Sequence, residues 1–318
     1  NECQLSMKYH NNKFSRPQYA CQKLVSLTKD LIEPSRPADI RQQTLIFYTK
    51  LIQGQYRDLS MMRTHFFRLI QTHDSPSDLS LYLQMLKALT ENGRDIQNFE
   101  EEIGIFMLKW MDQIIEANLT APYLDLVVNI IKSNSAFVDR EIIVGIVQRV
   151  CNEVCIQFVN DKETFLQCLF VIETVICYTV FPNEILAPCI IVLCRAVNSE
   201  VYVETSYKIM KNLLGTQLGY ASLLTMTSML NDSRYYVDPH VLRGAVFHIN
   251  MNLWGGNNTS LQNGMKYSST VLSSYLKVLQ SGFVIVTYEV ILSMQTLMNK
   301  CGQNLSETSW DIVCLLYT

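Results

Sequence analysis

The amino-acid sequence predicts an all-α protein, and three observations lead to this prediction. The 318 residues include 12 glycines and 8 prolines, whereas average usage would give about 22 and about 16. Apolar residues recur at steps of three and four along almost the whole chain, which is the period of an amphipathic helix. Short polar breaks divide this pattern into about fifteen helices. Few helix breakers and a helical period together favour long helices over strands.

The spacing of the polar breaks predicts how the helices are arranged. The clearest breaks are short and lie at 33–37, 73–76, 117–122, 181–183 and 231–238. Helices joined by such short loops lie against their neighbours in the sequence. Antiparallel pairs would then recur about every forty residues, as in HEAT or armadillo repeats. We therefore expect a HEAT/armadillo-like α-solenoid built of antiparallel helix pairs.

A single solenoid is expected to span residues 1–318. One compact core stops growing near this chain length, and longer helical chains become arrays of repeats. The last residues, WDIVCLLYT at 310–318, lie in the middle of an apolar pattern. The solenoid is therefore expected to continue beyond residue 318.

Several predicted helix starts carry residues suited to a helix N-terminus. Ser75 and Asp238 each precede a proline, which places a capping oxygen just before a residue whose missing N–H is harmless in the first turn. Asn98, with Glu101 three residues later, resembles a capping box. The acidic run 100–102 puts negative charge at the positive end of the helix dipole. These features predict that helices begin at these three places.

The segment 205–218 is predicted to be amphipathic, and another helix begins at Pro239. The apolar stripe of the first comprises Ile209, Met210, Leu213, Leu214 and Leu218. Gly215 and Gly219 bracket a predicted helix junction. Gly244 would cost about 1 kcal/mol inside a helix relative to alanine, so it indicates a close approach of neighbouring backbone.

One long polar connection interrupts the helical pattern. It reads GGNNTSLQNGMKYSS and occupies 255–269. Because Gly, Asn and Ser favour turns and are poorly suited to burial, this segment is predicted to be an exposed loop. Helical pairs resume directly after it, so no domain boundary is expected there.

Composition and charge exclude two function classes. The chain has 26 basic and 29 acidic residues, a net charge of −3, and its basic residues form no cluster of the kind that binds nucleic acid. The longest apolar stretches, such as 185–193, are much shorter than the roughly 20 residues that a membrane span needs. We therefore expect neither nucleic-acid binding nor a membrane span.

The ten cysteines indicate a reducing, cytoplasmic environment. Six of them sit among Val, Ile and Leu, where a free cysteine behaves as a small core residue: Cys151, Cys155, Cys168, Cys177, Cys189 and Cys194. A disulfide-built domain would be smaller and richer in loops. Free thiols are therefore expected.

No sequence motif indicates catalysis, a metal or a cofactor. The chain lacks a Walker-type phosphate loop, a dinucleotide-binding glycine pattern and a GxSxG elbow. It has no CxxC pair, and none of its five histidines forms a metal-ligand pattern with cysteine. We therefore expect no catalytic residue, no metal site, no cofactor and no enzyme activity. The alternative is an enzyme with dispersed catalytic residues, which would have a deep polar pocket with perturbed titratable groups.

The remaining candidate sites are surfaces for binding a partner. On the helix from Pro239, a stripe of mixed character at helical spacing comprises Arg243, Phe247, Asn250 and Trp254. Arginine and aromatic residues together are typical of interface anchors. The alternative interpretation is that Phe247 and Trp254 pack on the next layer of the solenoid, beneath the stem of Arg243.

A second candidate surface lies on the predicted helix 205–218. Lys208 and Lys211 lie off its apolar stripe and could pair with an acidic coiled coil. The alternative interpretation is that they form an ordinary solvated helix face.

Seven short segments, in one order along the chain, resemble the N-terminal part of the tuberin family. They are LIQGQ at 51–55, KALTENGR at 87–94, FMLKWMD at 106–112, KIMKNLLGTQLG at 208–219, LRGAVF at 242–247, TYEVILS at 287–293 and SWDIV at 309–313. Tuberin is the larger subunit of the tuberous sclerosis complex. The resemblance implies that this chain is the helical scaffold of such a subunit, without its distant catalytic domain.

The resemblance also implies a function. Members of the tuberin family bind hamartin, which contributes a long coiled coil, and the complex activates GTP hydrolysis by Rheb and so restrains TOR signalling. Their catalytic asparagine lies in the C-terminal domain, so Rheb would be reached only through a domain absent here, and Asn212 inherits no such role. A cytoplasmic protein, recruited to the lysosomal surface as part of the complex, is implied.

The alternative function is that of an unrelated armadillo-type adaptor that binds extended peptides. Such adaptors present regular ladders of Asn and Trp along their inner groove. The three tryptophans here, Trp110, Trp254 and Trp310, are irregularly spaced. This spacing disfavours the adaptor.

Overall fold

The computed structural model describes residues 16–54, 60–72, 75–157, 159–254 and 258–317. Within these ranges the regular secondary structure is entirely helical and contains no strand, so the prediction of an all-α fold is confirmed. In the same ranges, fifteen α-helices have ten or more residues, as expected from the pattern of breaks. None of these helices combines the length and the apolar character needed to cross a membrane.

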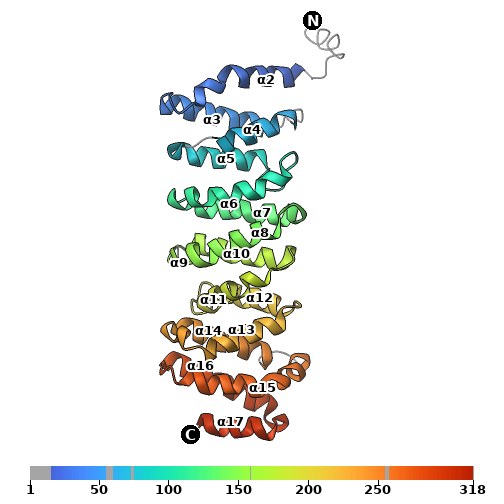
Figure 1. Ribbon diagram of the computed structural model, residues 1–318, viewed down its shortest axis with the longest axis vertical. Helices are drawn as coiled ribbons and strands as arrows, with labels where there is room; N and C mark the ends of the chain where they lie inside the picture. Colours follow the sequence, from blue (N-terminus) through green and yellow to red (C-terminus); the bar gives the residue numbers. More distant parts are fainter. Residues whose placement is uncertain (1–15, 55–59, 73–74, 158, 255–257, 318) are drawn as a thin grey trace. The chain divides into compact units, whose positions relative to one another are not determined.

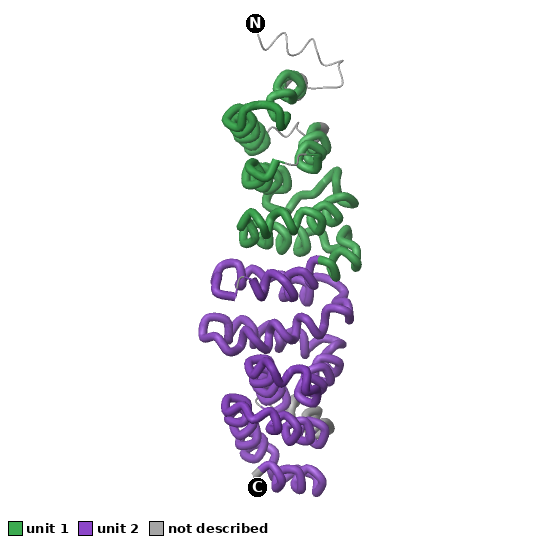
Figure 2. Tube along the Cα trace, turned by 60° about the vertical axis from the view of Figure 1, so that its left-hand side comes forward, with its two compact units in different colours: residues 1–145 green, residues 146–318 purple. Residues whose placement is uncertain are grey.

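The chain divides into two compact units, residues 1–145 and residues 146–318 (Figure 2). Unit 1 contains α2 (Arg16–Thr28), α3 (Ala38–Gln53), α4 (Ser60–Thr72), α5 (Leu79–Leu89), α6 (Glu100–Glu116) and α7 (Thr120–Asn134), with 3-10 turns η1 (Lys29–Ile32), η3 (Pro76–Asp78) and η4 (Ser135–Phe137). Helix α3 packs on α5, α4 on α5, and α6 on α7. Helix α8 (Arg140–Arg149) includes the residues at which the two units meet in sequence.

Unit 2 begins within α8 and continues with a π-helical turn, η5 (Val150–Val154). Its further elements are α9 (Cys155–Gln157), α10 (Lys162–Tyr178), η6 (Asn183–Ile185), α11 (Leu186–Ala196), α12 (Val203–Leu214), α13 (Gly219–Asn231), η7 (Ser233–Val237), α14 (Pro239–Leu253), α15 (Asn258–Leu279), α16 (Val284–Cys301), η8 (Gly302–Asn304) and α17 (Glu307–Tyr317).

The helices of unit 2 stack in two rows (Figure 1). In one row α11 packs on α14 and α14 on α16, and in the other α13 packs on α15 and α15 on α17. Consecutive helices also contact each other across the rows, for example α13 with α14 and α15 with α16. Pairs of helices stacked in this way form the predicted α-solenoid. That one solenoid spans residues 1–318 stays a prediction.

The predicted helix caps differ in outcome. Asp238 caps α14, because its Oδ1 accepts hydrogen bonds from the backbone N–H groups of His240 and Val241 at 3.1 Å each. Ser75 makes no cap bond and precedes the 3-10 turn η3. Its hydroxyl instead accepts a hydrogen bond from Arg41 at 3.4 Å, so the prediction of a Ser75 cap is wrong.

The start of α6 is only partly as predicted. The acidic run 100–102 lies in its first turn, which agrees with the dipole argument. The capping box is wrong, because the N-cap residue is Phe99 and Asn98 adopts a left-handed φ of 80°. Asn98 tolerates that conformation better than most residues, so it serves the turn before the helix.

The glycine junction is confirmed, although the amphipathic segment 205–218 does not form one helix. Helix α12 ends at Leu214 with Gly215 at its C-cap, and α13 begins at Gly219. Leu218, placed on the apolar stripe by its spacing, is the N-cap residue of α13.

The predicted loop 255–269 is wrong over residues 258–269, and residues 255–257 lie outside the described ranges. Residues from Asn258 onward belong to α15. Val271, Leu272 and Tyr275 are buried on this helix, and packing of such a face stabilises a helix more than local propensity does. The helix therefore extends back through polar residues that alone would favour a turn.

The cysteines in the described ranges mostly behave as core residues. Of the six expected to be buried, five are buried free thiols and Cys177 is exposed. Burial raises the pKa of the Cys194 thiol. The hydrogen bond with Cys189 and burial together raise that of Cys151 well above its usual value. Raised thiol pKa values make these groups poor nucleophiles at neutral pH.

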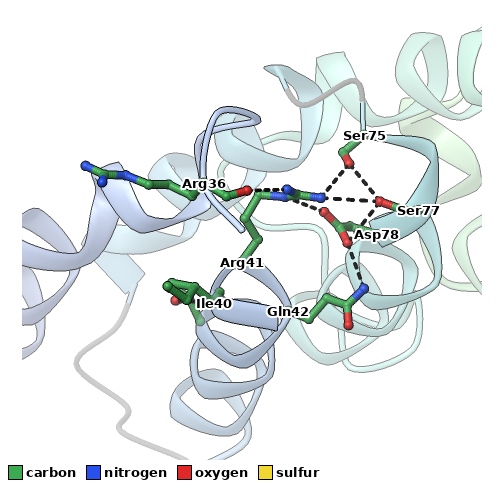
Figure 3. Close-up of polar contacts among 8 residues, drawn as sticks. Arg36, Ile40, Arg41, Gln42, Ser75, Ser77 and Asp78 are labelled. Atoms are coloured by element: carbon green, nitrogen blue, oxygen red, sulfur yellow. Dashed lines mark hydrogen bonds and ion pairs between the residues drawn. The ribbon is translucent and has the colours of Figure 1, made fainter. Parts of the chain in front are cut away.

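A buried polar cluster joins α3 to the turn before α5 in unit 1 (Figure 3). Arg41 Nε lies 2.9 Å from Asp78 Oδ2, and both side chains are buried. Gln42 donates to the other carboxylate oxygen at 3.2 Å, and Arg41 also donates to the Arg36 carbonyl at 2.6 Å. The remaining contacts of the guanidinium are to the hydroxyls of Ser75 and Ser77. No sequence pattern predicted this cluster, because its members lie more than thirty residues apart.

Candidate partner-binding surface

The position of α14, which carries the predicted stripe, is set by Gly244. A Cβ atom at this residue would lie 1.9 Å from the backbone oxygen of Cys194 on α11. Only a residue without a side chain permits such a contact. The close backbone approach inferred from Gly244 is therefore confirmed, and it brings α14 directly against α11.

Arg243 on α14 contacts two other parts of unit 2, helix α16 and the residues after α11. Its Nε lies 3.0 Å from Glu289 Oε2 on α16, and its Nη1 donates to Asn198 Oδ1 after α11 at 3.0 Å. The Glu289 side chain is only 4% exposed. Burial raises the pKa of Glu289, and Arg243 partly offsets that effect. Arg243 is thus a partner for a buried charge as well as a surface residue.

The other members of the stripe lie deeper than a contact surface would. Trp254 is buried, and its indole N–H donates to Ser293 Oγ on α16 at 3.1 Å. Asn250 is also buried. Phe247 is half-buried, and its ring lies at an edge-on angle to the ring of His248. The structure therefore leaves only Arg243 and Phe247 of this stripe within reach of a partner.

The two lysines occupy a different place. Lys208 and Lys211 are on α12, which packs on α10. Lys208 Nζ lies 3.2 Å from Glu173 Oε1 of α10, at the surface, and Lys211 is exposed. The structure thus places these lysines beside α10 and the stripe beside α16. Partner binding by either group stays a prediction.

Replacing Arg243 with alanine is expected to destabilise unit 2 by about 2 kcal/mol, because Glu289 would keep its buried charge without a partner. This estimate lies below the usual cost of breaking a buried pair because Arg243 is partly exposed. Urea unfolding measures the loss. Adding Glu289→Gln to the same variant should restore part of the stability. If the double variant is no more stable than Arg243→Ala, the ion-pair explanation is wrong.

His248 fills a buried position between α11, α12 and α14. Its Nε2 lies 3.4 Å from the Leu193 carbonyl, which also accepts a hydrogen bond from Ser206 Oγ at 2.7 Å. Burial lowers the pKa of His248 from 6.5 to about 4, and the contact with the carbonyl opposes this shift. The folded unit therefore keeps the imidazole neutral.

Acid is expected to destabilise unit 2 through His248. Below pH 6.5 the unfolded chain binds a proton that the folded unit does not, so the stability present above that pH is lost as the pH falls towards 4. The loss should reach about 3 kcal/mol over this interval. Urea unfolding from pH 7 to pH 4 tests this, with His248→Gln as the reference. Equal losses in both proteins would contradict the prediction.

A pocket of about 490 Å³ opens on unit 2 beside α9 and α11. Its walls come from α9, α10, α11 and the residue that caps α14, and include Cys155, Ile156, Val159, Phe165, Val192, Arg195, Ala196, Tyr202 and Asp238. Sequence reasoning missed this pocket, because its residues are spread over more than eighty positions. In the described residues no group of three metal-ligating side chains is arranged to hold a metal ion.

Comparisons with known proteins agree with this architecture. A solved structure described as "Structure of the TSC2 N-terminus" is similar to this chain with a TM-score of 0.70. The two are 15% identical, and the match covers 95% of this chain and 94% of that chain. TSC2 is tuberin, so the match confirms the solenoid fold that the resemblance implied. Residues 6–317 match the family described as "Domain of unknown function (DUF3384)", and this protein belongs to that family.

Proposed function

We propose that this chain is a non-catalytic scaffold domain that binds the coiled coil of hamartin and so assembles a tuberous sclerosis complex. The observation that supports this most is the shared fold with the TSC2 N-terminus over 95% of this chain. In the assembled complex, a GTPase-activating domain outside this chain would act on Rheb and restrain TOR signalling. The complex would work in the cytoplasm and at the lysosomal surface.

The described surface offers features that suit a helical partner. Exposed apolar side chains occur on several elements of unit 2, among them Ile156, Val159, Tyr220 and Leu224. Ile156 and Val159 line the same pocket, and exposed apolar residues that lie together favour association with a protein. An amphipathic helix can cover such residues because its own backbone hydrogen bonds are already satisfied.

The peptide-binding adaptor is less well supported. Trp110 and Trp254 are buried, so they do not form an exposed ladder along a groove. Trp310 alone of the three is partly exposed. An adaptor of this kind would need another set of groups to bind an extended backbone.

Calorimetric titration with the C-terminal coiled coil of hamartin tests the proposal. Saturable binding is expected, and an unrelated coiled coil of matched charge should not bind. Circular dichroism of the same sample verifies that the chain is folded. If a folded sample binds neither coiled coil, or both equally, the scaffold proposal is wrong.

A further inference from the structure

The pocket beside α9 and α11 has an apolar interior and an exposed apolar mouth. Phe165 and Tyr202 stack in its wall, with ring centroids 4.6 Å apart. At the mouth, Ile156 is 59% exposed and Val159 is 53% exposed. Covering apolar surface of this kind is favourable. The stacked rings also give the pocket a formed wall before any ligand arrives, which lowers the cost of binding.

The charges at the rim are not equally available. Asp238 uses Oδ1 to cap α14 and Oδ2 to hold Arg195 Nε at 2.8 Å. Asp161 follows the lining residue Asn160 and caps α10 through bonds to Glu163 and Thr164. Both carboxylates therefore already serve helix N-termini.

Arg195 differs from these carboxylates because part of its hydrogen-bonding capacity is unused. Its side chain is 44% exposed, and among the described residues only its Nε makes an ion pair. The two terminal nitrogens of the guanidinium can still donate to a carboxylate, in the planar geometry that arginine favours. A ligand with a negative charge next to an apolar group complements this pocket.

We propose that this pocket is the anchor site for a helix of the partner coiled coil, which inserts apolar side chains between Ile156, Val159 and Phe165 and brings an aspartate or glutamate to Arg195. The inference rests on the proposed function and gives it a location. Fixed apolar walls and one positioned arginine are the features that concentrate binding energy in a few residues. The α14 stripe contributes little in this arrangement, since Trp254 and Asn250 are buried.

Matched valine substitutions test the location. Val159→Asp places a charge at the pocket mouth, whereas Val284→Asp makes the same change at an 81% exposed valine on α16 of the same unit. With the hamartin coiled coil as the probe, Val159→Asp should weaken binding at least about tenfold, and Val284→Asp should leave it unchanged. Arg195→Ala should weaken binding several-fold.

The outcomes separate this inference from the proposed function. If the unchanged chain does not bind, the proposed function fails. If the unchanged chain binds, and the folded Val159→Asp and Arg195→Ala variants bind as tightly as it does, the partner docks elsewhere and the pocket assignment is overturned. Melting temperatures identify any variant that fails to fold. In that case Ile156→Asp replaces Val159→Asp, because Ile156 is also exposed at the mouth.

Discussion

Replacing Gly244 with alanine is expected to destabilise unit 2 by about 3 kcal/mol, because the new methyl group would meet backbone that cannot turn aside. The Cβ position lies 1.9 Å from the Cys194 carbonyl oxygen and 2.5 Å from its carbon. Helices α11 and α14 would have to separate, which loosens the row that continues to α16. Urea unfolding measures the loss, and hydrogen exchange should locate it in α11 and α14. Gly244→Leu should be more damaging still.

Gly104→Ala is the matched control for this prediction. Gly104 is also inside a helix, and its Cβ position lies 2.9 Å from Ile142 Cδ1. That atom is the end of a flexible side chain, so it can move. Because alanine also favours a helix by about 1 kcal/mol over glycine, the net change should stay within about 1 kcal/mol. If Gly244→Ala is as stable as Gly104→Ala, the close backbone contact does not control α14.

Replacing Asp78 with alanine is expected to destabilise unit 1 by about 3 to 5 kcal/mol, the usual cost of leaving a buried charge without its partner. Arg41 would keep its guanidinium inside the fold with only neutral acceptors (Figure 3). Urea unfolding followed by circular dichroism measures the change. Replacing both residues with apolar ones of similar size should cost less, because no charge is then stranded.

A surface pair provides the control for Asp78. Glu173→Ala removes the partner of exposed Lys208 and should cost less than about 1 kcal/mol. Equal losses of stability in Glu173→Ala and Asp78→Ala would contradict the role of burial.

Acid offers a second test of Asp78. Burial alone would raise the pKa of Asp78, but hydrogen bonds from Arg41, Gln42 and Ser75 lower it below its usual value. The contribution of Asp78 to stability is therefore complete above about pH 4 and is lost as the pH falls further.

Local chemistry predicted most helix positions and failed where packing competes with it. The cap at Asp238 and the junction at Gly215 and Gly219 depend on a few adjacent residues, and both are confirmed. Helix α15 depends on burial of residues such as Tyr275. Local patterns do not reveal this burial, so the polar first half of α15 resembles a loop in the sequence.

The candidate site shows the same contrast between what local spacing predicts and what packing determines. Helical spacing placed Arg243, Phe247, Asn250 and Trp254 on one stripe, but spacing does not say which neighbour covers a stripe. The contacts of α14 with α16 decide that Trp254 is buried and that Arg243 neutralises Glu289. The pocket beside α11 needs residues from 155 to 238 to come together, which no local pattern records.

Local patterns in the sequence suffice to predict that this protein is all-α, built of repeated helix pairs and free of the common catalytic motifs, because helix period, capping and breaker content act within a few residues of one another. Which stripe faces solvent, which charges are buried and where a pocket opens follow from the packing of the helices. Those properties depend on contacts between distant helices, and such contacts are set by the shapes of side chains and by the close approach of backbone at Gly244.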